Sequence, residues 1–119
     1  MEKVGVVTVT YNSEDVFHAF LLDVVSQRHT NFILYVIDNA SNDSTLEILS
    51  RFKDIRIKLI KNTSNKGVAA ANNQGVKEAI KNNCSQILLL NNDIFFLRVE
   101  LEYTIPILIL QHMINVETR

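Results

Sequence analysis

The chain has 119 residues, which suit one compact domain and are too few for two. It is 47% hydrophobic and 21% charged, a composition that indicates a globular protein and excludes a disordered one. The formal net charge is -1 and lysine and arginine are spread along the chain, so we expect no nucleic-acid surface.

The single Cys84 excludes an internal disulfide framework and a cysteine zinc cluster, and it suits a reducing compartment. Residues 4–9 are too few and too rich in β-branched side chains for the core of a signal peptide. The most hydrophobic late stretch, residues 105–110, is far below the roughly 20 residues that span a bilayer. We therefore expect a soluble, cytoplasmic protein without a membrane span.

The first third of the chain predicts two strands separated by a helix. Residues 4–10 form a short, apolar, β-branched run, which is typical of a buried strand. Apolar residues between positions 16 and 25 then recur at helical spacing, and Glu14 and Asp15 occupy the first turn, where the helix dipole favours acidic side chains. After Asn31, residues 32–37 predict a second buried strand.

The middle of the chain predicts two further helices and two further strands. Ser44 and Glu47 match a capping box at the start of a short helix. In residues 55–59 isoleucine and leucine alternate with basic side chains, which predicts a half-exposed strand at an edge of the sheet. One face of a third helix carries Val68, Val76, Ala79 and Ile80. Residues 86–90 then predict a fourth buried strand.

Alternating strands and helices predict an α/β fold in three layers, with helices on both faces of a mostly parallel sheet. No internal repeat divides the chain, so we expect one domain. For the tail we predict a helix over about residues 106–116, because Pro106 can open a helix but cannot sit comfortably inside one. Residues 97–105 fit a strand and a helix alike and stay open.

Polar residues follow each predicted strand. The carboxyl ends of parallel strands share one edge of the sheet, and ligands bind beyond that edge near the point where the strand order reverses. We therefore expect these residues to converge on one site. They are Thr10, Tyr11 and Asn12 after the first strand, Asp38 after the second, Asn65 and Gly67 after the third, and Asn91, Asn92 and Asp93 after the fourth.

The residue types at this edge suit a nucleoside diphosphate with a divalent cation. Asp38 can accept hydrogen bonds from a pyrimidine or a ribose, and the ring of Tyr11 can stack on a base. The helix start at Gly67 offers unpaired backbone N–H groups to phosphates. Asp93 can hold a divalent cation through oxygen.

Each of these residues also has a simpler interpretation. Asp38 can shape an Asx turn, Tyr11 can serve in packing, and Asp93 can cap a following helix. Asn72 lies on the apolar face of its helix, so it is either a satisfied buried amide or a residue that reaches a ligand from the first turns. The joint placement of the four clusters carries the argument for a site.

Four segments occur in a characteristic order. They are residues 7–12 (VTVTYN), 36–45 (VIDNASNDST), 65–75 (NKGVAAANNQG) and 89–93 (LLNND). Together they resemble the inverting family 2 glycosyltransferases of the GT-A fold, and the resemblance covers about residues 3–96. One such motif is unspecific, whereas four in order at fitting distances are specific.

The resemblance implies a sheet ordered 3-2-1-4 that binds a nucleotide-diphosphate sugar, by default a UDP or dTDP sugar. It implies that Thr10, Tyr11 and Asp38 hold the base and the ribose. It also implies that residues 91–93 occupy the DxD position of the family, with Asp93 reaching Mn²⁺ or Mg²⁺ on the diphosphate. Asn91 stands in place of the first acid, and its amide can bind a sugar hydroxyl or a metal-bound water.

Family members continue after this motif into a half that binds the acceptor and carries an acidic general base. The three acids after position 96 match no such motif, so we predict no catalytic residue in this chain. We expect residues 1–96 to be the nucleotide-sugar-binding domain and residues 97–119 to be a partly helical tail of the same domain, in a truncated chain that transfers no sugar. The alternative is a non-catalytic nucleotide-binding or assembly module. A dehydrogenase or a P-loop enzyme is disfavoured because GxGxxG and GxxxxGK[ST] are both missing.

The fourth predicted strand raises a question of assembly. Its apolar sequence is typical of a strand with a neighbour on each side, yet the order 3-2-1-4 places it at an edge. An apolar edge invites pairing. We therefore expect the tail to cover it or the chain to form a homo-oligomer through this side.

Overall fold

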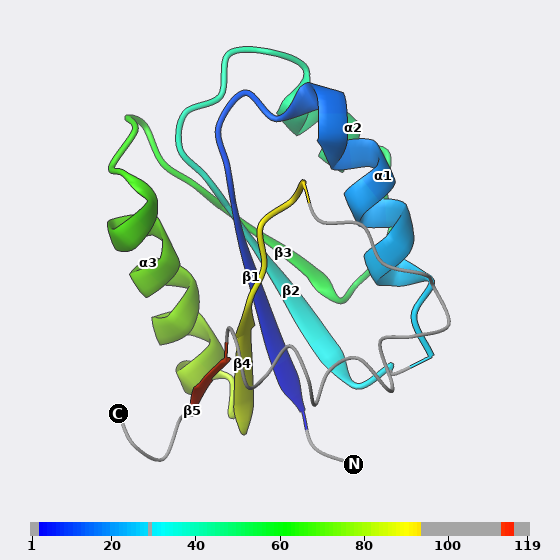
Figure 1. Ribbon diagram of the computed structural model, residues 1–119, viewed down its shortest axis with the longest axis vertical. Helices are drawn as coiled ribbons and strands as arrows, with labels where there is room; N and C mark the ends of the chain where they lie inside the picture. Colours follow the sequence, from blue (N-terminus) through cyan, green and yellow to red (C-terminus); the bar gives the residue numbers. More distant parts are fainter. Residues whose placement is uncertain (1–2, 29, 94–112, 116–119) are drawn as a thin grey trace.

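A computed structural model describes residues 3–28, 30–93 and 113–115. In these ranges a central sheet lies between α1 and α2 on one face and α3 on the other (Figure 1), which confirms the predicted three-layer α/β fold. The elements are β1 (Val4–Thr10), α1 (Glu14–Val25), β2 (Phe32–Asp38), α2 (Thr45–Ser50), β3 (Ile57–Lys61), α3 (Val68–Lys81), β4 (Gln86–Leu89) and β5 (Met113–Asn115). None of the helices in the described ranges has the length and apolar character needed to cross a bilayer.

The sheet has the strand order β3-β2-β1-β4-β5. The strands β1 to β4 are parallel, so the order 3-2-1-4 that the resemblance implied is confirmed. The register of β1 with β2 runs from Val4↔Phe32 to Thr10↔Asp38. Thr10 and Asp38 therefore lie side by side where the two strands end.

Each face of the sheet has its own apolar core. The core under α1 and α2 includes Val4, Val6, Phe17, Phe20, Leu34 and Leu88, and the core under α3 includes Val7, Tyr35, Ile37, Val76 and Ile87. At Gly75 a Cβ atom would lie only 2.4 Å from Cγ1 of Val7. Glycine at this position therefore lets α3 pack directly on β1.

The buried face of α3 differs in part from the predicted one. Its buried residues are Ala71, Gly75, Val76 and Ala79. Val68 is 64% exposed and Ile80 is exposed as well, so two of the four predicted positions are wrong. The close approach of α3 to β1 explains the difference, because small side chains are needed along the line of contact.

The third strand begins two residues later than the alternating pattern predicted. Ile55 is 89% exposed and lies in the turn before β3. Asp54 closes this turn, because its carboxylate accepts hydrogen bonds from the backbone N–H of Arg56 at 2.9 Å and from the guanidinium of Arg56 at 2.6 Å. The strand starts only at Ile57, and β3 lies at the sheet edge as predicted.

The predicted capping box of α2 is not formed. Ser44 is the N-cap residue, but its side chain makes no capping hydrogen bond. Instead, Oδ1 of Asp43 accepts hydrogen bonds from the backbone N–H of Thr45 at 2.9 Å and from its hydroxyl at 2.6 Å. A carboxylate is a stronger acceptor than a hydroxyl, and Glu47 pairs with Arg51 at 2.7 Å instead of reaching back.

Residues 113–115 form a strand, so the prediction of a helix over residues 106–116 is wrong for this part. They pair antiparallel with β4, with Ile114 opposite Ile87. The open edge of β4 presents unpaired backbone groups, and a paired strand satisfies them. The expectation that the tail covers the fourth strand is therefore confirmed, and a homo-oligomer through this side stays a prediction. The rest of the predicted helix and residues 97–105 lie outside the described residues.

Candidate functional site

The strand order of the sheet reverses between β1 and β4. The chain runs from β1 to β2 and β3 with α1 and α2 on one face, and then returns to the other side of β1 through α3 on the opposite face (Figure 1). A crevice opens at such a reversal, beyond the carboxyl ends of the strands. Two cavities lie at this position.

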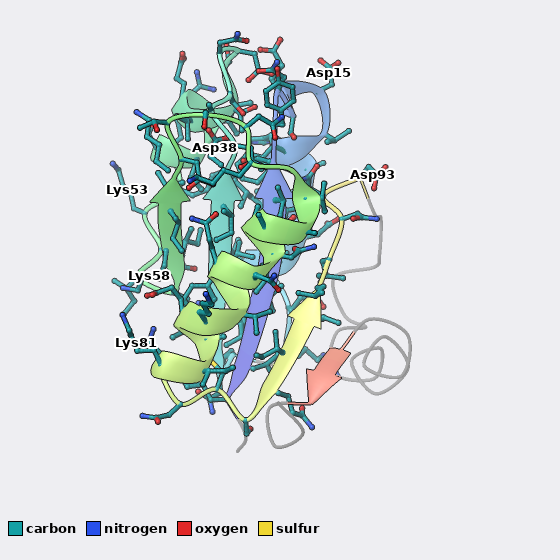
Figure 2. The ribbon with its side chains drawn as sticks, turned by 90° about the vertical axis from the view of Figure 1, so that its left-hand side faces the viewer. Asp15, Asp38, Lys53, Lys58, Lys81 and Asp93 are labelled. Carbon is teal, nitrogen blue, oxygen red and sulfur yellow. The ribbon has the colours of Figure 1, made fainter. Side chains whose placement is uncertain are left out.

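The larger cavity has a volume of about 420 Å³ and lies between the turn after β1 and the residues that follow β4. Its described lining consists of Val9, Asn12, Ser13, Asp15, Val16, Asn91, Asn92 and Asp93. This lining contains the carboxylates of Asp15 and Asp93 and no lysine or arginine. Figure 2 shows both carboxylates toward the same end of the sheet as Asp38, whereas Lys58 and Lys81 lie farther toward the other end.

The smaller cavity has a volume of about 150 Å³ and lies between the first turns of α3 and the end of β4. Val9 and Asn91 line both cavities, so the two are neighbours. The other lining residues are Val68, Asn72, Leu89 and Leu90. Asn72 is half-buried and lines this cavity. No side chain caps the N-terminus of α3, so its first N–H groups are available beside the cavity.

Asp38 is fully buried, and its carboxylate is hydrogen-bonded within the protein. Oδ1 accepts hydrogen bonds from the hydroxyls of Thr10 at 2.7 Å and Ser41 at 2.6 Å, and Oδ2 accepts the backbone N–H of Ser41 at 2.9 Å. These bonds hold a turn in which Ala40 has a φ of 64°, a conformation that alanine rarely adopts. In this structure the carboxylate of Asp38 therefore shapes the turn after β2, which is the simpler of its two interpretations.

The turns after β1 and β2 hold each other. The backbone N–H of Asn12 donates to Oγ of Ser41 at 2.8 Å, and Oδ1 of Asn12 accepts the backbone N–H of Asn42 at 2.9 Å. Beside them Tyr11 is 50% exposed, which leaves its ring accessible for stacking. Tyr11 and Asn12 thus stand on a preformed rim beside the larger cavity.

Residues 91–93 line the larger cavity, and their contacts divide them into two groups. Nδ2 of Asn92 donates to the backbone carbonyl of Val9 at 2.7 Å and to the hydroxyl of Thr8 at 3.3 Å, so Asn92 fastens the chain after β4 to β1. Asn91 and Asp93 are exposed. Among the described residues nothing forms a hydrogen bond or ion pair with the carboxylate of Asp93.

The segment before α3 is shaped by its own polar groups. Oδ1 of Asn65 accepts the backbone N–H of Gly67 at 2.9 Å, and Gly67 has a φ of 85° that suits glycine. Both residues are exposed at the predicted edge, although neither belongs to the described lining of the two cavities.

The parallel strands therefore end at one edge of the sheet, and the predicted residues at that edge differ in how exposed they are. Thr10, Asp38 and Asn92 hold the turns, whereas Tyr11, Asn91 and Asp93 offer exposed groups. The sequence reasoning assigned Asp15 only to the helix dipole, although it lines the larger cavity. It also assigned no role to Asn62 or to Gln74, although Gln74 lies in the segment 65–75 that carries the resemblance.

Solved structures with this fold include complexes with nucleotide sugars. The mannosyltransferase PcManGT from Pyrobaculum calidifontis, in complex with GDP-Man and Mn²⁺, has a TM-score of 0.72 at 23% identity, over 81% of this chain and 29% of that one. S. aureus TarS 1-349, in complex with UDP-GlcNAc, has a TM-score of 0.77 at 24% identity, over 92% of this chain and 32% of that one. At these identities the likeness shows the fold.

Curated relatives are glycosyltransferases. WfaP of Escherichia coli, the UDP-Glc:alpha-D-GlcNAc-diphosphoundecaprenol beta-1,3-glucosyltransferase, is 37% identical over 79 residues, which are 66% of this chain and 32% of WfaP. An uncharacterized glycosyltransferase of Haemophilus influenzae is 29% identical over 116 residues, which are 96% of this chain and 45% of that protein. The chain thus spans less than half the length of these two relatives.

The model of glycosyl transferase family 2 matches residues 5–109. This range contains β2 to β4, all of β1 except Val4, and every residue that lines the two cavities in the described part of the chain. By this match, which the fold supports, the chain belongs to glycosyl transferase family 2.

Proposed function

We propose that this chain binds the nucleotide-diphosphate sugar of a glycosyltransferase at the two cavities between β1 and β4. The observation that carries the proposal is their position at the reversal of the strand order, beside the uncapped N-terminus of α3. A diphosphate needs hydrogen-bond donors and positive charge, and a helix N-terminus supplies both.

A divalent cation completes this site, because the larger cavity is acidic. An anionic diphosphate next to Asp15 and Asp93 would be repelled without a counter-ion, and the described lining contains no cationic side chain. Mg²⁺ is bound through one or two carboxylates plus substrate phosphates, and Mn²⁺ takes similar oxygen ligands. The exposed carboxylate of Asp93 fits that role. In the described ranges no three His, Cys, Asp or Glu side chains form a metal cluster, which suits a cation that binds together with the nucleotide.

The base and ribose lie, in this proposal, against the turns after β1 and β2. Tyr11 offers its ring for stacking and Asn12 lines the adjacent cavity. Thr10 and Asp38 act from inside by fixing these turns. A UDP or dTDP sugar is the default from the resemblance, while PcManGT holds GDP-Man and TarS holds UDP-GlcNAc, so uracil, thymine and guanine are all candidate bases.

In the complete enzyme the sugar passes to an acceptor hydroxyl with inversion. A general base takes the proton, and the cation stabilises the leaving diphosphate. We assign only the donor-binding step to this chain, place that step in the cytoplasm and expect no sugar transfer from the 119-residue polypeptide by itself. Nucleotide binding alone would also fit a non-catalytic module, and acceptor-dependent release of the diphosphate by a longer protein that contains this chain would exclude that alternative.

Calorimetric titration with UDP, dTDP and GDP, in Mn²⁺ and in EDTA, tests the proposal. We expect binding of at least one nucleotide, tighter in Mn²⁺, and we expect Asp93→Ala to remove the difference between the two conditions. Glu47→Gln is the matched control, because Glu47 is an exposed acid on α2 that lines neither cavity. The absence of heat with all three nucleotides in both conditions would contradict the proposal.

A further inference from the structure

Three amide side chains form a cluster behind the segment that leads into α3. Asn39 follows β2, Asn62 follows β3 and Gln74 lies within α3. Asn39 is 1% exposed and Asn62 is 7% exposed, while Gln74 is half-buried. We call these three residues the amide cluster. Buried amides are costly unless they are hydrogen-bonded, so their contacts indicate what the cluster holds.

Within the cluster the contacts fix each amide in one orientation. Nδ2 of Asn62 donates to Oε1 of Gln74 at 2.8 Å, and Nε2 of Gln74 donates to Oδ1 of Asn62 at 2.9 Å. Nδ2 of Asn62 also donates to Oδ1 of Asn39 at 3.0 Å. Because Oδ1 of Asn39 faces Asn62, Nδ2 of Asn39 donates to an acceptor outside the cluster.

That acceptor lies at the start of α3. Nδ2 of Asn39 donates to the backbone carbonyl of Gly67 at 3.2 Å, and Oδ1 of Asn39 accepts the backbone N–H of Lys66 at 3.4 Å. Gly67 is the N-cap residue of α3. The backbone N–H of Asn39 donates to the carbonyl of Thr10 at 2.9 Å. One residue therefore joins the end of β1 to the N-terminus of α3, across the edge where the cavities lie.

We infer that the amide cluster positions the N-terminus of α3 for the diphosphate of the donor, so that Asn39, Asn62 and Gln74 are positioning residues. The inference rests on the proposed function. The backbone groups of an exposed loop can be satisfied by water, whereas here the buried side chain of Asn39, which Asn62 and Gln74 hold in place, bonds the two residues that precede the first N–H groups of α3. Val68, the first residue of α3, lines the smaller cavity. A helix start held in this way keeps its N–H groups aimed at one place, and a small displacement of such groups weakens binding.

Gln74→Glu tests the inference with almost no change of shape. A protonated glutamic acid can donate to Oδ1 of Asn62 as glutamine does, whereas a carboxylate can only accept and would place two acceptors face to face. The affinity for UDP with Mn²⁺ should be about tenfold below that of the unsubstituted chain at about pH 7.5, and this loss should become smaller at about pH 4.5, where a glutamic acid with the ordinary pKa of about 4.3 is partly protonated. Affinity for uridine, which has no phosphate, should keep its ratio at both pH values.

Two further variants complete the experiment. Gln74→Met keeps the length of the side chain and removes both hydrogen bonds, so it should weaken UDP binding at every pH. Lys77→Met introduces the same side chain at an exposed position of the same helix, and this variant should bind UDP as the unsubstituted chain does.

Equal affinity for UDP in both Gln74 variants and the unsubstituted chain would overturn the inference and leave the proposed function intact. An equal loss for UDP and uridine would also overturn it, because general loosening would then explain the result. If the unsubstituted chain binds no nucleotide, both the inference and the proposed function fail.

Discussion

Asp43 and Glu14 cap each other's helices. Oδ2 of Asp43 accepts the backbone N–H of Glu14 in the first turn of α1 at 3.2 Å, and Oε1 of Glu14 accepts the backbone N–H of Ser44 before α2 at 2.8 Å. Oδ1 of Asp43 serves α2 at the same time through Thr45. Unpaired N–H groups at two helix N-termini are thus satisfied by two carboxylates. This pair also joins the turns after β1 and β2 beside the larger cavity.

We predict that Asp43→Ala destabilises the protein by about 1–2 kcal/mol, because both helices lose an N-terminal hydrogen bond. Urea denaturation at neutral pH measures the change. Glu47→Ala is the control, since Glu47 is an exposed acid in α2 whose ion pair with Arg51 lies at the surface and contributes little. Equal stability of the Asp43 variant and the control would contradict the capping role.

Acid should remove part of the stability through Asp43 and Asp54. Desolvation acts to raise the pKa of Asp43, but hydrogen bonds from Thr45 and from the backbone N–H of Glu14 outweigh it and lower the pKa from its ordinary value of 3.8. The pKa of Asp54 is lowered chiefly by the hydrogen bond from the side chain of Arg56. A carboxyl whose folded pKa is depressed contributes stability that is fully present above its unfolded pKa and is lost as the pH falls through the folded value.

We therefore expect the contribution of these two carboxyls to be constant above about pH 5 and to decline below about pH 4. Urea midpoints across this range measure the decline, and the double substitution Asp43→Asn with Asp54→Asn should make it shallower. An unchanged acid slope in the double variant would show that other carboxyls carry the effect.

The strands and helices were predictable where local pattern and tertiary environment agree. The first two strands are apolar runs, and α1 buries Phe17 and Phe20 on the face that helical spacing predicts. The apolar sequence of β4 predicted that its edge would be covered, but not that residues 113–115 would cover it as a strand, because the partner that makes them a strand is distant in sequence. Local propensity gives no information on such a partner.

The candidate site shows the same limit. Its edge followed from topology alone, because parallel strands bring their carboxyl ends together. The roles of Asp38 and Asp93 did not follow, since both are acids that come at or just after a strand end. The hydroxyls of Thr10 and Ser41 occupy Asp38, and the chain gives Asp93 no such neighbours among the described residues. That difference is one of tertiary surroundings, which the spacing of residues cannot reveal.

Gly75→Ala should destabilise the protein although alanine favours a helix by about 1 kcal/mol. The new Cβ atom would lie 2.4 Å from Cγ1 and 3.0 Å from Cγ2 of Val7, which is fully buried in the core under α3. We expect a net loss of about 1–3 kcal/mol from this overpacking. Val7→Ala in the same chain should recover part of the loss. Urea denaturation of the unsubstituted chain, the two single variants and the double variant should show that the double variant is more stable than the sum of the two single losses predicts. Additive effects would contradict the close contact of α3 with β1.

The two carboxylates of the larger cavity should respond differently to substitution. Asp15→Asn removes one negative charge from the lining and leaves Asp93 in place. We expect UDP to bind about two- to fivefold tighter in EDTA, because an anionic ligand meets less repulsion in a solvent-screened site, and we expect binding to remain tighter with Mn²⁺ than without it. Asp93→Asn should also relieve repulsion in EDTA, but it should abolish the gain from Mn²⁺ because the proposed metal ligand is lost.

Calorimetry at low salt and at about 0.5 M salt measures both effects, and the gain from Asp15→Asn should shrink at high salt because it is electrostatic. Loss of the Mn²⁺ effect in Asp15→Asn, with Asp93→Asn unaffected, would reverse the assignment and make Asp15 the cation ligand.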